Sequence, residues 1–255
     1  MSKKRPKSFA VAAIACCAIL FAVGIGFGDR AHKHPMPIGS NSGPMMDRIN
    51  VVAPKFGHAP VRPATVATCR EVLRKLPPTI YQLLEKGGAT INLAPNIEDN
   101  WPGSGDGRKP GPYDETMGEE SGRTYGRDVW LYESEKVRGS QELKTPRSQD
   151  QMKDNMYQLL GHSINDCMGV VSNNPEFSKV YYEDVDKMQP LAKLNFAAST
   201  ERDQDSIGLG TSEIIGVLIG GEGHHDVFPV LDNFPKTTAY LKRELLKKQT
   251  IPKAP

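Results

Sequence analysis

Apolar residues recur at helical spacing in four long stretches of this 255-residue chain, and each stretch predicts a helix. They cover residues 66–86, 150–171, 175–188 and 234–248. Pro77 and Pro78 are expected to divide the first stretch, because a proline inside a helix removes a backbone hydrogen bond. A shorter apolar run at 211–218 predicts one more buried helix.

Strand patterns are fewer and shorter. Residues 89–94 alternate between apolar and polar side chains, and residues 128–133 form a second short run typical of a strand. The segment between them, 95–123, is rich in Gly, Pro, Asp and Glu, and we expect a long loop that is either functional or loosely ordered. Many helices with a few strands favour an α+β fold: a mainly helical single domain with a small sheet.

The N-terminal segment predicts attachment to a membrane. Lys3, Lys4, Arg5 and Lys7 precede residues 9–27, an uncharged apolar run about long enough to cross a bilayer as a helix. A cleaved signal peptide and an uncleaved signal anchor both fit this pattern, and the lack of a clear small-x-small cleavage site favours the anchor. The basic residues are expected to stay in the cytoplasm, so the rest of the chain is extracytoplasmic, or secreted if the segment is cleaved.

Composition divides the chain into four parts. They are a basic tip and membrane anchor (1–28), a Pro- and Gly-rich linker (29–65), a globular domain (66–250) and a short tail (251–255). The first 34 residues carry six Lys and Arg side chains against one Asp, a net charge of +5; since the whole chain carries +2, the remainder carries −3. A nucleic-acid-binding protein usually presents a basic surface, so this slightly acidic body argues against nucleic acid as a partner.

The cysteines allow one disulfide in the body of the protein. Cys16 and Cys17 lie in the membrane segment, which leaves Cys69 and Cys167. Their spacing indicates no metal site, and two cysteines in an oxidising compartment can pair. We therefore expect a disulfide between Cys69 and Cys167.

Three short motifs could carry chemistry. The first is the helical run QLLGHSIND at 158–166, the second is EIIGV at 213–217, and the third is GGEGHH at 220–225. In order and local context these residues resemble the anthrax-toxin lethal factor-like zinc peptidases, a family that includes Pro-Pro endopeptidases. The central helix of that family reads roughly H-E-x-G-H-A-x-D-D, and its last helix begins P-K-T, as at 235–237 here. The resemblance covers residues 66–248 and implies a gluzincin-like zinc-peptidase architecture.

The resemblance also implies a role for each matching position. In the family, two histidines one helical turn apart and a later glutamate bind zinc, and the glutamate between the histidines acts as the base. Here His162 matches the second histidine and Glu213 matches the third ligand. The first ligand position holds Gln158, whose neutral amide is a poor zinc ligand. The base position holds Leu159, which cannot accept a proton, and the position of the family's transition-state tyrosine holds Ser206.

Hydrolysis by the family mechanism is therefore not expected, because loss of a general base alone costs about 10²–10⁴ in rate. Asp166, His224 or His225 could instead complete a metal site with His162 and Glu213, and zinc would then be the cofactor. Other enzyme signatures are absent from the sequence: it has no nucleophile-elbow serine, no phosphate-binding glycine loop and no paired-cysteine zinc motif.

Three hypotheses about function follow. The first is a membrane-tethered pseudo-peptidase, catalytically inactive and acting in binding or scaffolding, whose former active-site cleft still holds an extended polypeptide. The second is an active zinc metalloendopeptidase with an atypical ligand set. The third is an unrelated structural domain of the cell envelope. Gln158, Leu159 and Ser206 favour the first.

Overall fold

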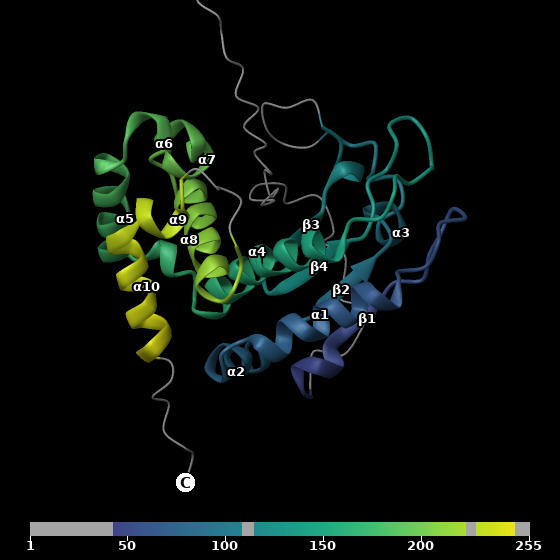
Figure 1. Cartoon of the computed structure of the whole chain (residues 1–255), viewed down its shortest axis with the longest axis horizontal. Coiled ribbons are helices and arrows are strands. Elements are labelled where there is room, and N and C mark those ends of the chain that lie inside the picture. The colour runs from purple at the N-terminus through teal and green to yellow at the C-terminus, as the bar shows by residue number, and fades with distance from the viewer. Residues whose placement is uncertain (1–42, 109–114, 223–227, 248–255) are drawn as a thin grey trace, which may run out of the picture.

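The computed structural model describes residues 43–108, 115–222 and 228–247 (Figure 1). Within these ranges a small sheet and the helices of the first half lie on one side of the long helix α4, Gln149–Cys167, and the later helices gather on its other side (Figure 1). The predicted fold class, α+β and mainly helical, is confirmed.

The sheet has four strands in the order β1-β2-β4-β3. Their bounds are Ile49–Val51 for β1, Ile91–Ala94 for β2, Gly122–Tyr125 for β3 and Asp128–Tyr132 for β4. β1, β2 and β4 are parallel, whereas β3 pairs antiparallel with β4. Both strands predicted from the sequence are confirmed as β2 and β4, and β3 occupies the edge of the sheet that lies nearest the later helices.

The alternation of side chains along β4 separates two apolar clusters. Val129 and Leu131 belong to the main core, and Trp130 and Tyr132 point to the opposite face and pack in a smaller cluster. Three helices supply the main core on their side of the sheet. They are α1 (Pro63–Lys75), α2 (Pro78–Gly87) and α4.

The predicted break at the proline pair is confirmed. α1 ends at Lys75, and Pro78 is the first residue of α2, where a proline needs no backbone N–H. α2 then ends at Gly87, and the φ of 75° at its C-cap, Gly88, lies in the left-handed region that favours glycine. The two glycines that follow the helical pattern therefore act as the predicted stop.

The segment predicted as a long loop is described at residues 95–108 and 115–123, where it crosses the outer face of the sheet. Within 95–123 it contains α3 (Ile97–Asn100), η2 (Met117–Glu119) and the start of β3. Asn96 caps α3, since its side chain accepts a hydrogen bond from the Glu98 backbone N–H. These short elements were not predicted, because the segment is rich in Gly, Pro, Asp and Glu, a composition typical of loops.

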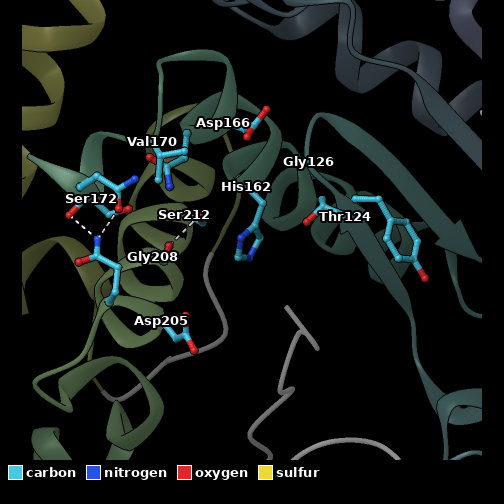
Figure 2. A pocket seen from close by; sticks show the side chains of 13 residues that line it. Thr124, Gly126, His162, Asp166, Val170, Ser172, Asp205, Gly208 and Ser212 are labelled. Carbon is cyan, nitrogen blue, oxygen red and sulfur yellow. Dashed lines mark hydrogen bonds between the residues drawn. The ribbon is translucent and has the colours of Figure 1, made fainter. Parts of the chain in front are cut away.

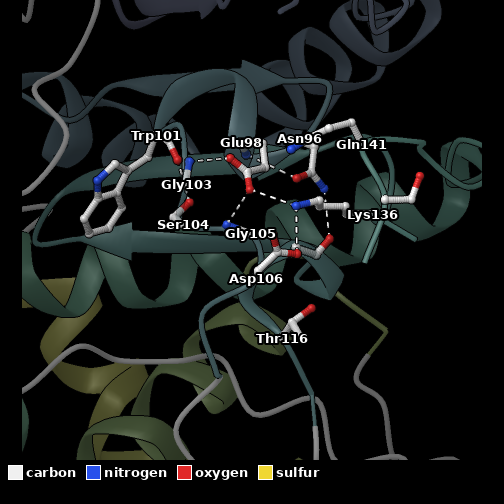
Figure 3. A network of polar contacts seen from close by, with 12 residues as sticks. Asn96, Glu98, Trp101, Gly103, Ser104, Gly105, Asp106, Thr116, Lys136 and Gln141 are labelled. Carbon is white, nitrogen blue, oxygen red and sulfur yellow. Dashed lines mark hydrogen bonds and ion pairs between the residues drawn. The ribbon is translucent and has the colours of Figure 1, made fainter. Parts of the chain in front are cut away.

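A buried charged network holds this segment in place (Figure 3). The Lys136 side chain is 1% exposed, and its Nζ lies 2.9 Å from Glu98 Oε1 and 2.8 Å from Asp106 Oδ1. Glu98 also accepts hydrogen bonds from the backbone N–H groups of Gly103 and Gly105. Burial acts to lower the pKa of Lys136, but hydrogen bonds to Asp106 and Glu98 act against it and the net shift is upward. We will call Lys136, Glu98 and Asp106 the lysine network.

The predicted linker needs a correction. Its last part folds with the domain: η1 (Met45–Arg48) precedes β1, and Met45 is fully buried. His58 is fixed as well, because its Nδ1 lies 2.8 Å from Asp99 Oδ2 and its Nε2 lies 2.6 Å from the Gln141 carbonyl oxygen. The domain therefore begins before residue 66, at the η1–β1 segment.

The second half of the described chain is helical. Its elements are η3 (Val171–Asn173), α5 (Pro175–Lys187), α6 (Pro190–Asn195), α7 (Ala197–Thr200), α8 (Gln204–Leu218), α9 (Val230–Asn233) and α10 (Pro235–Lys247). The helices predicted at 175–188 and 234–248 are confirmed as α5 and α10. The helix predicted at 211–218 is longer than expected, because Asp203 caps α8 at the Ser206 backbone N–H. α8 packs against α4, and this crossing frames the site described below.

The predicted disulfide is not formed: Cys69 and Cys167 are both free thiols. Cys69 lies near Glu133, just after β4, whereas Cys167 lies near Asp128 at the start of that strand. β4 has five residues and spans about 15 Å, and a disulfide needs Cα atoms within about 7 Å of each other. The spacing of the two cysteines in the sequence gave no sign that they sit toward opposite ends of a strand.

In the residues that the structure describes, no helix is both long and apolar enough to cross a bilayer. The predicted membrane segment, 9–27, and the predicted tail, 251–255, lie outside those residues.

Candidate functional site

A pocket of about 330 Å³ opens where β3, α4 and α8 meet (Figure 2). Its walls come from the end of β3 and the turn after it, from the C-terminal half of α4, from the η3 turn and from the N-terminal half of α8. His162 of α4 points into this space, with Thr124 on one side and Ser212 on the other (Figure 2). We will call it the His162 pocket.

Two glycines allow α4 and α8 to come close enough to form this wall. A Cβ added at Gly161 would overlap the backbone carbonyl oxygen of Ser212, and one added at Gly216 would lie 3.0 Å from the Tyr157 carbonyl oxygen. The backbones of the two helices are therefore in direct contact at this crossing. Ser148 starts α4 with a capping box, in which Gln151 returns the hydrogen bond.

His162 is buried and has an unsatisfied nitrogen. The residue is 8% exposed, and burial lowers the pKa of its imidazole from 6.5 to about 4. The ring is therefore neutral at physiological pH. Its Nε2 has no hydrogen-bond partner in the part of the chain that the structure describes. A buried nitrogen without a partner is costly, so this atom facing a pocket indicates a place for a ligand.

The two positions that precede His162 in the motif do not line the pocket. Leu159 is 2% exposed and belongs to the main core, where it packs against Gly122 of β3. Gln158 lies at the crossing with α8, since its Cα is 3.3 Å from the position that a Cβ on Gly216 would take. Leu159, at the predicted base position, is thus part of the main apolar core between α4 and the sheet.

On α8 the pocket is lined one residue earlier than the motif predicts. Asp205, Gly208 and Ser212 line it, whereas Ser206 and Glu213 do not. Ser206 is buried, and Glu213 lies on the side of α8 that faces α5. There burial raises the pKa of Tyr181 well above its usual value, and the charge of Glu213 adds to the effect.

Two polar side chains of the pocket wall already donate their hydrogen bonds within the protein. Ser212 donates its hydroxyl to the Gly208 carbonyl oxygen at 2.8 Å, which Figure 2 shows as a dashed line. The Gln204 amide donates to the Ser172 carbonyl oxygen at 2.7 Å and to Asn173 Oδ1 at 2.8 Å. Acceptor atoms are therefore what these side chains offer to a ligand.

Asp166 stands at the rim and already has a cationic partner. Its carboxylate lies 2.9 Å from Arg127 Nε, and the same guanidinium donates to the Gly87 carbonyl oxygen at 2.7 Å. This ion pair ties the end of α4 to the turn between β3 and β4. To bind a metal beside His162, Asp166 would have to give up this ion pair.

Backbone strain also lies at this wall. Val170, which lines the pocket, has a φ of 55°, a conformation that β-branched residues rarely adopt. Its N–H donates to the Asn165 carbonyl oxygen at 2.9 Å, and the Asn165 side chain accepts from the Val171 N–H at 3.1 Å. Such residues cost about 1–3 kcal/mol and cluster at binding and catalytic sites.

The open edge of β3 runs along the pocket. Tyr132 N–H donates to the Ser121 carbonyl oxygen at 2.9 Å, which sets the alternation of the ladder. The backbone N–H and C=O groups of Gly122 and Thr124 therefore point away from β4. Within the described part of the chain no strand pairs with this edge, so β3 can accept an added strand.

The described residues do not fit a catalytic zinc site. No group of three or more His, Cys, Asp or Glu side chains that could hold a metal ion is found among them. His162 is at the pocket, but Leu159 is in the core, and Glu213 is on another side of α8. His224 and His225 lie outside the described residues.

Comparison with known proteins supports the fold. No family model and no curated protein matches the chain. Among solved structures, the Pro-Pro endopeptidase (PPEP-2) from Paenibacillus alvei is similar, with a TM-score of 0.50 and 16% identity over 78% of this chain and 98% of that one. An identity this low shows the fold alone. At a coarse level the chain thus shares the fold of this peptidase.

Proposed function

We propose that this protein binds an extended polypeptide segment without cleaving it, in the cleft where related folds carry out peptidase chemistry. The observation that carries the proposal is the combination of a β3 edge that no described strand pairs with and, beside it, a His162 Nε2 that has no described hydrogen-bond partner. An edge strand binds a peptide through backbone hydrogen bonds, and a neighbouring pocket selects a side chain. The resemblance to Pro-Pro endopeptidases supports a polypeptide as the partner.

Inactivity is proposed from residue chemistry. A leucine at the base position accepts no proton, and Leu159 packs in the core, where a water molecule has no place. Gln158 offers at best a neutral amide oxygen at the first ligand position. An active zinc endopeptidase remains the rival, because His162 Nε2 is free to bind a metal and His224 or His225 could join it.

The test compares binding with cleavage on the full chain, kept in a mild detergent because of its predicted membrane segment. A library of unstructured peptides is incubated with the protein, with and without added zinc, and the bound and free peptides are identified by mass spectrometry. We expect a subset to be retained at full length under both conditions. Zinc-dependent cleavage that disappears in His162→Ala would establish the rival function.

A substitution on β3 tests the binding mode. Thr124→Pro removes an N–H that points away from β4, so the ladder with β4 keeps its bonds while the bound peptide loses one. We expect about a tenfold loss of peptide affinity. Thr124→Val is the matched control, because it keeps the N–H and removes the hydroxyl, and its affinity should stay near that of the wild type. Equal affinity of all three proteins would rule out binding along β3.

The proposal also places the domain outside the cytoplasm, tethered through residues 9–27. The basic cluster in front of this run supports it. The free thiols of Cys69 and Cys167 remove the support that a disulfide would have given. Alkaline carbonate extraction of membranes, followed by external protease, tests the tether: release by carbonate or full protection from protease would contradict it.

A further inference from the structure

We propose that the His162 pocket takes the basic side chain, lysine or arginine, of a polypeptide bound along β3. This inference rests on the proposed function and adds the chemistry of the bound residue. Three independent features of the pocket point to a ligand that is cationic and rich in hydrogen-bond donors.

The first feature is the charge of the lining. Asp166 and Asp205 contribute carboxylates, and no Lys or Arg lines the pocket among the residues that the structure describes. Arg127 balances Asp166 from outside the pocket. Asp205, exposed in the first turn of α8, has no ion pair with a described residue, so it is available to a cation.

The second feature is the direction of the hydrogen bonds. Both N–H groups of the Gln204 amide and the hydroxyl hydrogen of Ser212 are donated to other residues of the wall. Asp203 accepts from the Ser206 N–H at 2.7 Å and so occupies a backbone donor at the start of α8 that could otherwise hold an anion. These donors are therefore not available to an anionic ligand.

The third feature is the unpaired nitrogen of His162. The residue is more than nine-tenths buried and aims its ring into the pocket (Figure 2). A neutral imidazole with a free ring nitrogen can accept a hydrogen bond. An ammonium group has three donors and a guanidinium group has five, so either group can donate to more than one of the acceptors that line the pocket.

The test uses four labelled nonapeptides that differ only at the central residue, which is lysine, norleucine, arginine or citrulline. Norleucine keeps the four-carbon chain of lysine without the ammonium group, and citrulline keeps the shape of arginine without its charge. Binding to the full chain in detergent is measured by fluorescence anisotropy. We expect the lysine and arginine peptides to bind about tenfold more tightly than their neutral partners.

Two variants test whether the preference for a charged side chain arises in this pocket. Asp205→Asn should bring the affinities of charged and neutral peptides within about twofold of each other. Asp150→Asn is the matched control, because Asp150 is an exposed aspartate in the first turn of α4 and does not line the pocket. It should leave the tenfold preference intact.

Each outcome decides a different claim. Equal binding of all four peptides would overturn the basic-side-chain inference and leave polypeptide binding standing. No binding of any peptide in the library or in this series would overturn the proposed function itself. A charge preference that survives Asp205→Asn would show that the basic side chain binds elsewhere.

Discussion

The lysine network and the His162 pocket differ in whether their buried polar groups have hydrogen-bond partners within the described protein. Lys136 and Glu98 are as buried as any side chains of the core, and each has several partners within the protein (Figure 3). His162 is nearly as buried, yet it lines a pocket (Figure 2), and its Nε2 has no hydrogen-bond partner among the described residues. A buried polar group that is fully satisfied stabilises the fold, whereas one that is left open at a cavity is available to a ligand.

The same contrast appears in the backbone around the two regions. The lysine network holds residues 98–106 across the outer face of the sheet with bonds to backbone N–H groups. At the His162 pocket, by contrast, no described strand pairs with the outward N–H and C=O groups of β3, and the backbone is strained at Val170. We infer that the lysine network makes its side of the sheet rigid and that the His162 pocket, with the edge of β3, binds the ligand.

The largest effect should come from breaking the lysine network. Lys136→Met leaves Glu98 buried without its cation, and we expect the free energy of unfolding to fall by about 3–5 kcal/mol. Lys144→Met is the control, because the Lys144–Glu135 pair is half-exposed and its loss should cost about 1 kcal/mol or less. Urea unfolding of both variants measures the difference; similar losses would show that the network does not stabilise the fold as described.

The pH dependence of stability should reveal the buried His162. Its pKa falls from 6.5 to about 4 on folding, so the unfolded chain takes up a proton that the folded protein refuses. The stability of the wild type is therefore complete above about pH 6.5 and declines as the pH falls toward about 4, by up to about 3 kcal/mol. His162→Asn should lack this part of the decline in urea unfolding at several pH values. Parallel curves for the two proteins would mean that His162 is not held neutral.

Two glycine substitutions should sharpen the description of the pocket wall. Gly161→Ala forces a Cβ against the Ser212 carbonyl oxygen and should destabilise the fold by about 1–3 kcal/mol. Gly208→Ala lies on the partner helix with free space around its Cβ, 3.9 Å from Ser172 Oγ, and should stabilise α8 by up to about 1 kcal/mol. Thermal unfolding compares them, and the same sign for both would contradict the close crossing of α4 and α8.

The smallest effect should come from reductant. Cys69 lies toward the end of β4 near Glu133, and Cys167 lies beside Asp166 at the pocket, so a disulfide would tie the two regions together. Burial raises the pKa of Cys69 to about 12 and that of Cys167 to about 11, which makes both thiols unreactive. Reductant should leave the melting temperature unchanged, and thiol titration of the denatured Cys16→Ser/Cys17→Ser protein should recover both thiols. A loss of about 2–4 kcal/mol on reduction would indicate the bond.

Much of the fold could be predicted because periodic apolar residues mark long helices. The stripe through Met152, Met156 and Leu160 placed α4, and proline positions placed the start of α2. β1 and β3 were missed because each is only three or four residues long and lies in a Pro- or Gly-rich segment. Partners far apart in the sequence, such as Lys136 and Glu98, leave no local signal at all.

The site was predicted in part for a similar reason. His162 was found from its motif, and it does face the pocket. A gapless match then pointed to Ser206 and Glu213, whereas the pocket is lined by Asp205 and Ser212, which have the same spacing of seven residues. A shift of one residue turns a side chain by about 100° around a helix, enough to move it from the pocket to the side facing α5.

The most direct test of the central claim, that the His162 pocket binds polypeptide and is not a catalytic zinc centre, is the zinc content of the full chain and of His162→Ala. Both proteins are dialysed against excess zinc, then against buffer, and measured by elemental analysis. Because the two chains share every other histidine, their difference reports on this pocket alone. We predict the same zinc content for both. Stoichiometric zinc in the wild type that is lost in His162→Ala would contradict the account and identify the pocket as a metal centre.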